Sequence, residues 1–263
     1  MSGGPPRIFD RKAIALHRAR AARIGGDPFL ANEAADGLSA RLTGITRQFP
    51  RRMELVLGDD EHVETSEPLD LLTSVLTLHS VNDLPGVLVQ AKRALKPDGL
   101  FLAAMFGGET LTELRQSLAA AESEILGGIS PRVSPFADVR DLGGLLQRAG
   151  FALPVADVER TVVRYSEVFS LVRDLRVMGE TNALMERSRK PMRRDMLAAA
   201  LAHYAEHFSD GDGKLRATFD IVYLTGWAPH ESQQRPLKPG SAKTRLADAL
   251  GTRENSSGEK PGD

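Results

Sequence analysis

Residues 69–104 read LDLLTSVLTLHSVNDLPGVLVQAKRALKPDGLFLAA, and this stretch decides the fold. The almost continuously apolar run from Leu69 to Leu78 predicts a strand that is buried on both faces. Asp83 is placed to cap a helix, and the turn Lys96–Gly99, predicted as type I, leads into a second apolar strand, Leu100–Ala104. Strand, helix and strand in this order form a β-α-β unit, so the sequence predicts an α/β fold with a parallel sheet.

Further helices and strands surround this unit. Thr110 and Glu113 have the spacing of a capping box and predict a helix that ends at Gly127. Asp138 and Gly150 mark the start and the stop of another helix. The remaining helices are predicted near residues 11–23, 29–42, 167–178 and 192–208. Alternating apolar residues predict two more strands, at residues 158–165 and 218–225.

Polar side chains follow both strands of the β-α-β unit. His79 and Asn82 come directly after the first strand, at the edge where open α/β sheets bind their ligands. Glu109 follows the glycine pair Gly107-Gly108 between the second strand and a helix, a geometry that can present backbone N–H groups to an anion. Each of these residues is also compatible with an ordinary loop, so a ligand site and plain turns both remain open.

Two later loops carry acid/base groups without an obvious structural task. Glu180 and Asn182 follow a predicted helix, and His230 and Glu231 follow the last predicted strand. These groups are either caps of their elements or parts of a site. We predict that Glu109, His79, Asn182 and His230 lie in one cleft at the carboxyl ends of the central strands.

Composition sets limits on the rest. With 263 residues and 41% hydrophobic content, the chain can bury one α/β core, predicted over residues 7–250 between disordered tails 1–6 and 251–263. Lys and Arg number 34 against 35 Asp and Glu, so no basic field favours nucleic acid. The absence of cysteine indicates a reducing, cytoplasmic setting. No stretch approaches the length of a transmembrane helix.

Two side-chain clusters have ordinary alternatives. His203 and His207 are one helical turn apart, a spacing that can hold a metal, but no third ligand is evident, so no metal site is predicted. Five basic residues form either a solvated helix edge or a docking site for an acidic partner: Arg187, Arg189, Lys190, Arg193 and Arg194.

Several peptides between Ile8 and Ala249 resemble the complex I assembly factor 5 family, a branch of the class I S-adenosylmethionine-dependent methyltransferases related to malonyl-carrier-protein methyltransferases. They are IFDR (8–11), AMFGGETL (104–111), SPRVSPF (130–136), MGETN (178–182) and GWAPHESQ (226–233). The resemblance implies a class I methyltransferase-like, Rossmann-like open sheet with helices on both faces and a helical insertion. It also implies that the last two strands form an antiparallel edge.

The resemblance fails at the cofactor loop. Residues 49–60 read FPRRMELVLGDD and pass almost directly to what looks like the exit of the family's third strand, without a Gly-rich loop. The segment is too short for a crossover helix and another parallel strand, so the first strands are expected to be truncated. Asp59 falls where the family has an acidic turn that meets the cofactor's adenine, and a solvated acidic loop is the alternative.

The resemblance implies S-adenosylmethionine-dependent modification of a protein side chain during assembly of respiratory complex I, with arginine hydroxylation of an iron–sulfur subunit reported for the family. Asp59 and His79 are then expected near the cofactor, whose binding is expected to be weak or lost. Asn82, Glu109, Glu180, Asn182, His230 and Glu231 are expected in the substrate cleft. No catalytic residue is assigned, because methyl transfer depends mainly on positioning.

Two other functions compete with this one. A degenerate, non-catalytic methyltransferase scaffold would bind an assembly partner without modifying it. An RNA-modifying enzyme is disfavoured by the neutral charge and the lack of a basic stretch interleaved with aromatic residues. The expected partner is a protein, a subunit of respiratory complex I. The expected location is cytoplasmic, peripheral to the inner membrane through that partner.

Overall fold

The computed structural model describes residues 7–234 and 251–252 of the chain. The chain forms two compact units, Met1–Pro229 and His230–Asp263. The predicted tails 1–6 and 253–263, and residues 235–250 of the predicted domain, lie outside the described residues. Among the described residues no helix combines the length and the apolar character needed to cross a membrane.

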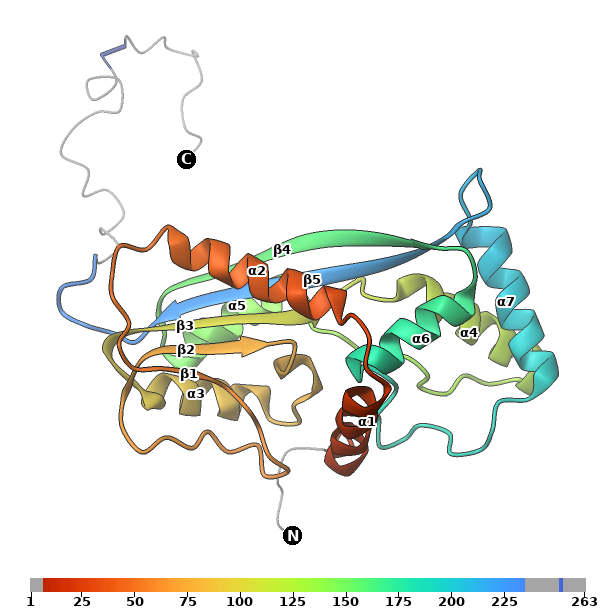
Figure 1. Cartoon of the computed structure of the whole chain (residues 1–263), viewed down its shortest axis with the longest axis horizontal. Helices are drawn as coiled ribbons and strands as arrows, with labels where there is room; N and C mark the ends of the chain where they lie inside the picture. Colours follow the sequence, from red (N-terminus) through yellow and green to blue (C-terminus); the bar gives the residue numbers. More distant parts are fainter. Residues whose placement is uncertain (1–6, 235–250, 253–263) are drawn as a thin grey trace, which may run out of the picture. The chain divides into compact units, whose positions relative to one another are not determined.

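The first unit is built on a five-stranded sheet of order β1-β2-β3-β5-β4 (Figure 1). Its strands are β1 (Arg52–Glu54), β2 (Leu69–Val75), β3 (Leu95–Gly107), β4 (Ala152–Tyr165) and β5 (Leu215–Trp227). The first three strands are parallel, whereas β5 runs antiparallel to both β3 and β4. The predicted open sheet and its antiparallel edge are therefore confirmed.

The truncation of the first strands is also confirmed. Strand β1 has only three residues and pairs directly with β2, with Met53 opposite Leu72. Residues 55–68 join the two strands as a loop that contains no helix. The sheet therefore ends at β1, where a complete class I sheet would continue.

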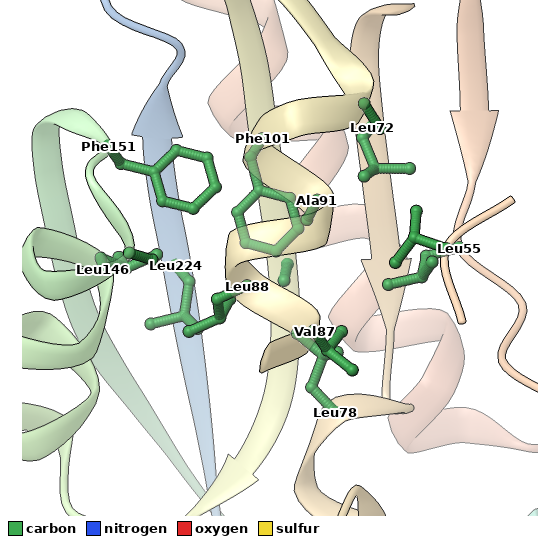
Figure 2. Packing of buried hydrophobic residues seen from close by; sticks show 14 of the residues in the cluster. Leu55, Leu72, Leu78, Val87, Leu88, Ala91, Phe101, Leu146, Phe151 and Leu224 are labelled. Atoms are coloured by element: carbon green, nitrogen blue, oxygen red, sulfur yellow. The ribbon is translucent and has the colours of Figure 1, made fainter. Parts of the chain in front are cut away.

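Helices cover both faces of this sheet, as predicted. They are α1 (Arg11–Ile24), α2 (Phe29–Thr43), α3 (Leu84–Ala94), α4 (Thr112–Leu126), α5 (Val139–Ala149), α6 (Val168–Met178) and α7 (Arg194–Phe208), with the short 3-10 helix η1 (Leu78–Ser80). On one face, Leu88 and Ala91 of α3 and Leu146 of α5 pack on Phe101 and Leu224 of the sheet (Figure 2). The core on the other face includes residues of α2, α6 and α7.

The structure confirms the helix caps that the sequence predicts at Asp83 and Asp138. The Asp83 carboxylate accepts a hydrogen bond from the Gly86 N–H at 2.9 Å, and Asp138 accepts one from the Arg140 N–H at 2.8 Å. Gly150 ends α5 in the left-handed conformation, with φ of 86°. Such caps satisfy backbone groups that a helix terminus leaves without partners.

The predicted capping box at Thr110 and Glu113 is wrong. Helix α4 begins at Thr112 after Leu111, whose φ is 56°, and no side chain caps it. The Thr110 hydroxyl instead donates to the carbonyl of Asp220, and the Glu113 carboxylate accepts the N–H and the hydroxyl of Thr218. Both side chains therefore fasten the start of α4 to β5, a partner that lies more than 100 residues away along the chain.

Two details around β2 and β3 also differ from the prediction. Strand β2 ends at Val75 rather than Leu78, because Leu76 has a φ of 43°, which interrupts the extended chain. The segment Lys96–Gly99 is not a type I turn, because Asp98 has a φ of 62°. These residues belong to β3, where the register with β2 shifts between Leu69 and Leu71.

Candidate functional site

A cavity of about 220 Å³ lies at the carboxyl ends of β2 and β3. Its walls come from α1, η1, the segment after β3, residues 132–136 and the end of α6. Open α/β sheets bind ligands beyond the carboxyl ends of their strands, so the cavity is the first candidate for a site. Its lining includes Phe9, Arg18, His79, Phe106, Phe136, Glu180 and Asn182.

His79 lines this pocket from η1, the short 3-10 helix that follows β2. Its side chain is only 3% exposed, and its Nε2 lies 2.9 Å from a carboxylate oxygen of Glu180. The centroid of the imidazole ring lies 5.0 Å from the ring centroid of Phe106 and 5.9 Å from that of Phe136. Within the described residues, Nδ1 of His79 is buried and has no hydrogen-bond partner. The contact to Glu180 therefore engages Nε2 of His79, whereas Nδ1 stays buried in the protein interior.

The end of α6 positions Glu180. Gly179 takes a left-handed conformation with φ of 79°, and the Glu180 N–H then donates to the carbonyl of Leu175 at 2.8 Å. This reversal directs the Glu180 side chain to His79, where it remains 22% exposed. The carboxylate can therefore meet both the histidine and a ligand.

Asn182 joins two of the loops that line the pocket. Its Nδ2 donates to the carbonyl of Pro131 at 2.9 Å, and its Oδ1 accepts from the N–H of Leu184 at 3.0 Å. Both ends of the amide already have partners, so the geometry gives Asn182 a structural task in the pocket wall.

Arg11 of α1 fills the crevice between the ends of β1 and β2. Its guanidinium donates to the carbonyls of Leu57 at 3.1 Å, Gly58 at 3.0 Å and Ser80 at 3.2 Å. It also lies 3.6 Å from Glu61, which is itself buried. Burial lowers the pKa of Arg11 and the Glu61 charge raises it, and the guanidinium stays ionised at neutral pH.

Asn82 and Asp59 border a second, more open cleft of about 720 Å³. The Asn82 Oδ1 accepts from the N–H groups of Ile8 at 2.7 Å and Phe9 at 2.8 Å, and its Nδ2 donates to Glu61 at 3.0 Å. Asn82 thus holds the segment before α1 against the sheet. Asp59 lines the cleft beside other carboxylates.

Glu109 and the predicted residues of the second unit make other contacts. Glu109 does not line the pocket of His79 among the described residues, and its N–H donates to the carboxylate of Asp220 at 3.2 Å. His230 and Glu231 are exposed residues of the second unit, where Nδ1 of His230 lies 2.7 Å from the Ser232 hydroxyl. Of the three residues in the first unit that were predicted to share a cleft, the pocket contains His79 and Asn182.

Four pocket or crevice residues were missed by sequence reasoning. Phe106 and Phe136 have the apolar side chains typical of a core, and Arg11 and Arg18 belong to the arginine-rich first helix, for which the sequence predicts no site. The one sequence signal for the start of α1 is the IFDR peptide, residues 8–11, which contains Arg11 and resembles the start of the family's sequences.

Comparison with known proteins adds a family and several relatives. A family model described as a methyltransferase domain matches residues 13–154. The human protein "Arginine-hydroxylase NDUFAF5, mitochondrial" is 49% identical over 188 residues, which cover 71% of this chain and 54% of that protein. Its Danio rerio counterpart is 45% identical over 74% of this chain and 61% of its own length.

More distant matches include one enzyme sequence and one solved structure. The malonyl-[acyl-carrier protein] O-methyltransferase of Laribacter hongkongensis is 38% identical over 74% of this chain and 64% of its own length. The chain therefore spans less than two thirds of each of these three relatives. A crystal structure of the Bacillus subtilis YcgJ protein aligns with 62% of this chain and 65% of its own, at 12% identity and a TM-score of 0.39.

Proposed function

Because this chain belongs to the methyltransferase-domain family, we propose that it is an assembly factor for respiratory complex I that binds an arginine side chain of a subunit in the pocket of His79 and Glu180. The single observation that carries the proposal is the partly exposed Glu180 carboxylate held by a buried histidine inside a largely apolar pocket. The name of the NDUFAF5 relatives, arginine-hydroxylase, supports arginine as the bound residue.

The chemistry of the pocket matches the two parts of an arginine side chain. Phe9, Phe106 and Phe136 supply apolar and aromatic walls for the methylene stem and for the flat face of a guanidinium. Glu180 supplies a carboxylate, the preferred partner of that guanidinium.

The size of the pocket also favours one side chain over a cofactor. Pockets for small molecules and cofactors usually enclose about 300–1,000 Å³. The cavity beside His79 encloses about 220 Å³, which is below that range. We therefore propose that it receives a residue of a protein partner.

The residues present do not fit S-adenosylmethionine in the manner of an intact class I site. The crevice between the ends of β1 and β2 has no Gly-rich loop to offer N–H groups to the cofactor's carboxylate. Arg11 instead bridges the carbonyls of Leu57, Gly58 and Ser80 across that crevice. We therefore propose that S-adenosylmethionine binding is weak or lost and that binding the partner, rather than methylating it, is the main activity.

A second candidate function, S-adenosylmethionine-dependent modification of the bound subunit, is favoured by one observation. The cleft beside Asp59 has a volume of about 720 Å³, large enough for a cofactor, and borders Asn82. In this second proposal the cofactor would enter from that side. The partner remains a protein in both proposals, and we propose a cytoplasmic location, peripheral to the inner membrane through the partner.

Peptide binding tests the arginine proposal. The probes are the capped pentapeptides GGRGG, GGKGG and the citrulline analogue of the first, titrated into the full chain and followed by NMR of the labelled protein. We expect millimolar binding of the arginine peptide only, because a single side chain buries little area. E180Q should weaken that binding at least about tenfold, the equivalent of 1.4 kcal/mol, because the guanidinium loses its charged partner.

E109Q is the matched control, because Glu109 does not line the pocket within the described residues. It should leave the arginine peptide's affinity unchanged. Equal binding of the citrulline peptide, or full binding by a folded E180Q variant, would refute the proposal that this pocket binds an arginine side chain. Thermal unfolding of both variants establishes that they fold.

A further inference from the structure

Strand β4 is an edge of the sheet over its whole length. It spans 14 residues, Ala152–Tyr165, and in the described part of the chain it is hydrogen-bonded to β5 alone. An edge strand of this length presents a row of backbone N–H and C=O groups that can pair with another strand. Charged residues and short length usually prevent such pairing, and β4 is not short.

The middle of β4 carries two exposed valines on one face. Val158 is 46% exposed and Val162 is 48% exposed. Because side chains alternate along a strand, Val158, Arg160 and Val162 point to the same face. Nearer the start of the strand, Ala156 on this face packs against α5, as a Cβ on Gly143 of that helix would lie 3.7 Å from it.

Arg160, between the two valines, is already neutralised. Its guanidinium donates to both carboxylate oxygens of Asp220, at 2.7 Å and 2.9 Å. Those hydrogen bonds raise the pKa of Arg160. Because Asp220 binds Arg160 through both oxygens, Arg160 repels a second arginine placed beside it less strongly.

The charged side chains on the opposite face of the same segment also have partners within the molecule. Arg41 of α2 donates to Asp157 at 2.6 Å and to Glu159 at 2.8 Å. The hydroxyl of Thr161 donates to Glu33 at 2.6 Å. The charges that commonly protect an edge strand are therefore engaged within the molecule.

We propose that β4 pairs antiparallel with β4 of a second copy of this chain, with the two-fold axis at Arg160. In this register Val158 of each copy lies opposite Val162 of the other, and Glu159 lies opposite Thr161. The two Arg160 side chains also face each other, each held by both carboxylate oxygens of its own Asp220. Residues directly opposite in an antiparallel pair share a face, so both valine pairs form on the exposed face described above. The interface is isologous and closes as a dimer.

Neighbouring symmetric registers are less favourable. An axis at Glu159 places Val158 opposite Arg160, so no valine faces a valine there. An axis at Thr161 places Val162 opposite Arg160, and an axis at Val158 places Asp157 opposite Glu159. Like charges directly opposite destabilise a strand pair, and apolar pairs stabilise it. The Arg160 register alone among these matches valine with valine at both positions.

Sedimentation velocity of the full chain tests the proposal. Interfaces below about 1,200 Å² are typical of transient association, so we expect a dimer with a Kd of about 10–100 μM. V158K and V162E, each alone, should weaken dimerisation at least about tenfold, because each puts an unpaired charge opposite a valine. An equimolar mixture of the two variants should form heterodimers, because the introduced lysine and glutamate then face each other.

V56K is the matched control, because Val56 is 80% exposed in the loop after β1. It should dimerise as the unmodified chain does. A chain that remains monomeric at 500 μM, or a V158K variant that dimerises normally, overturns the proposal. Failure of the mixed variants to form heterodimers overturns the Arg160 register. Thermal unfolding of each variant shows that the strand itself is intact.

Discussion

Gly37 of α2 and Tyr223 of β5 are in such close contact that no other residue type fits at position 37. A Cβ on Gly37 would lie 2.5 Å from Cζ and 2.7 Å from Cε1 of Tyr223. Four residues further on, the Arg41 guanidinium lies over the Tyr223 ring, 3.5 Å from its centroid. Tyr223 thus sets how closely α2 approaches the sheet. Burial of the phenol raises the pKa of Tyr223 to about 12.

G37A should destabilise the protein by about 1–3 kcal/mol, because overpacking forces α2 away from the sheet. At about 2–4 °C per kcal/mol for a chain of this size, the change is visible in thermal unfolding. G44A is the control, because the nearest atom to its Cβ would be 3.8 Å away and the backbone there is right-handed helical. Equal melting temperatures for G37A and the unmodified chain would contradict the contact.

E113A should destabilise the protein by about 1–3 kcal/mol, the cost of leaving a buried donor unsatisfied. Glu113 accepts the Thr218 N–H at 3.0 Å in a fully buried setting, and the Thr218 hydroxyl also donates to it. E124A, an exposed glutamate of the same helix, is the control and should change stability by less than about 0.5 kcal/mol. Urea unfolding measures both, and equal effects would show that Glu113 acts only as a helix residue.

Acid should weaken the contribution of Asp70 to stability. The N–H of Arg51 donates to this carboxylate and lowers its pKa, burial opposes that shift, and Lys96 lowers the pKa further. A carboxyl with a depressed folded-state pKa stabilises the fold above its unfolded pKa of about 3.9 and loses that contribution as pH falls through the folded value. D70N should therefore be less stable than the unmodified chain at pH 7, and the difference should shrink below about pH 4.

The exposed Asp36 supplies the control for this pH series. D36N should differ little from the unmodified chain at any pH. A constant difference between D70N and the unmodified chain from pH 7 to pH 3 would show that Asp70 acts through shape alone.

S-adenosylmethionine should produce only a small thermal shift. A ligand at 100 times its Kd stabilises a protein by about 2.7 kcal/mol, which corresponds to about 5–11 °C here. Without a Gly-rich loop, each missing contact costs on the order of 1–3 kcal/mol, so we expect a much smaller shift at millimolar cofactor. A full-sized shift at micromolar cofactor would contradict this and would favour the catalytic alternative.

N82A should loosen the segment that includes α1. The Asn82 side chain makes three hydrogen bonds to the backbone of Ile8 and Phe9. Losing them, at about 1 kcal/mol each, should speed amide hydrogen exchange in residues 8–24 by about 10–100-fold. N32A, at an exposed asparagine of α2, is the control, and unchanged exchange in N82A would place the anchor of α1 elsewhere.

The sequence predicts elements well where the signal is local. Asp83 and Gly150 act on backbone groups within a few residues, so their caps were predicted correctly. Thr110 and Glu113 satisfy the same local pattern, but β5 offers them buried partners on a neighbouring strand. A long-range contact therefore overrides a local rule, and one sequence does not show which will prevail.

The candidate site was predictable only in its polar part. His79, Glu180 and Asn182 stand out as polar residues in loops, and the structure places all three at one pocket. Phe106 and Phe136 look like core residues in the sequence, because an apolar side chain gives the same pattern at a pocket wall. Arg11 was missed because its acceptors lie 46 to 69 residues away, on the exits of β1 and β2.

The position of β5 in the sheet has a consequence for synthesis of the protein. Strand β5 is the last strand among the described residues, yet it lies between β3 and β4. Leu100 of β3 therefore has no strand partner on that side until Trp227 has been synthesised. A nascent chain emerging from the ribosome exposes the edges of β3 and β4 until residues 215–227 arrive. Such unpaired edges are prone to aggregation at cellular concentrations. We expect newly made chains to depend on chaperones that shield strands β3 and β4 until β5 is inserted between them.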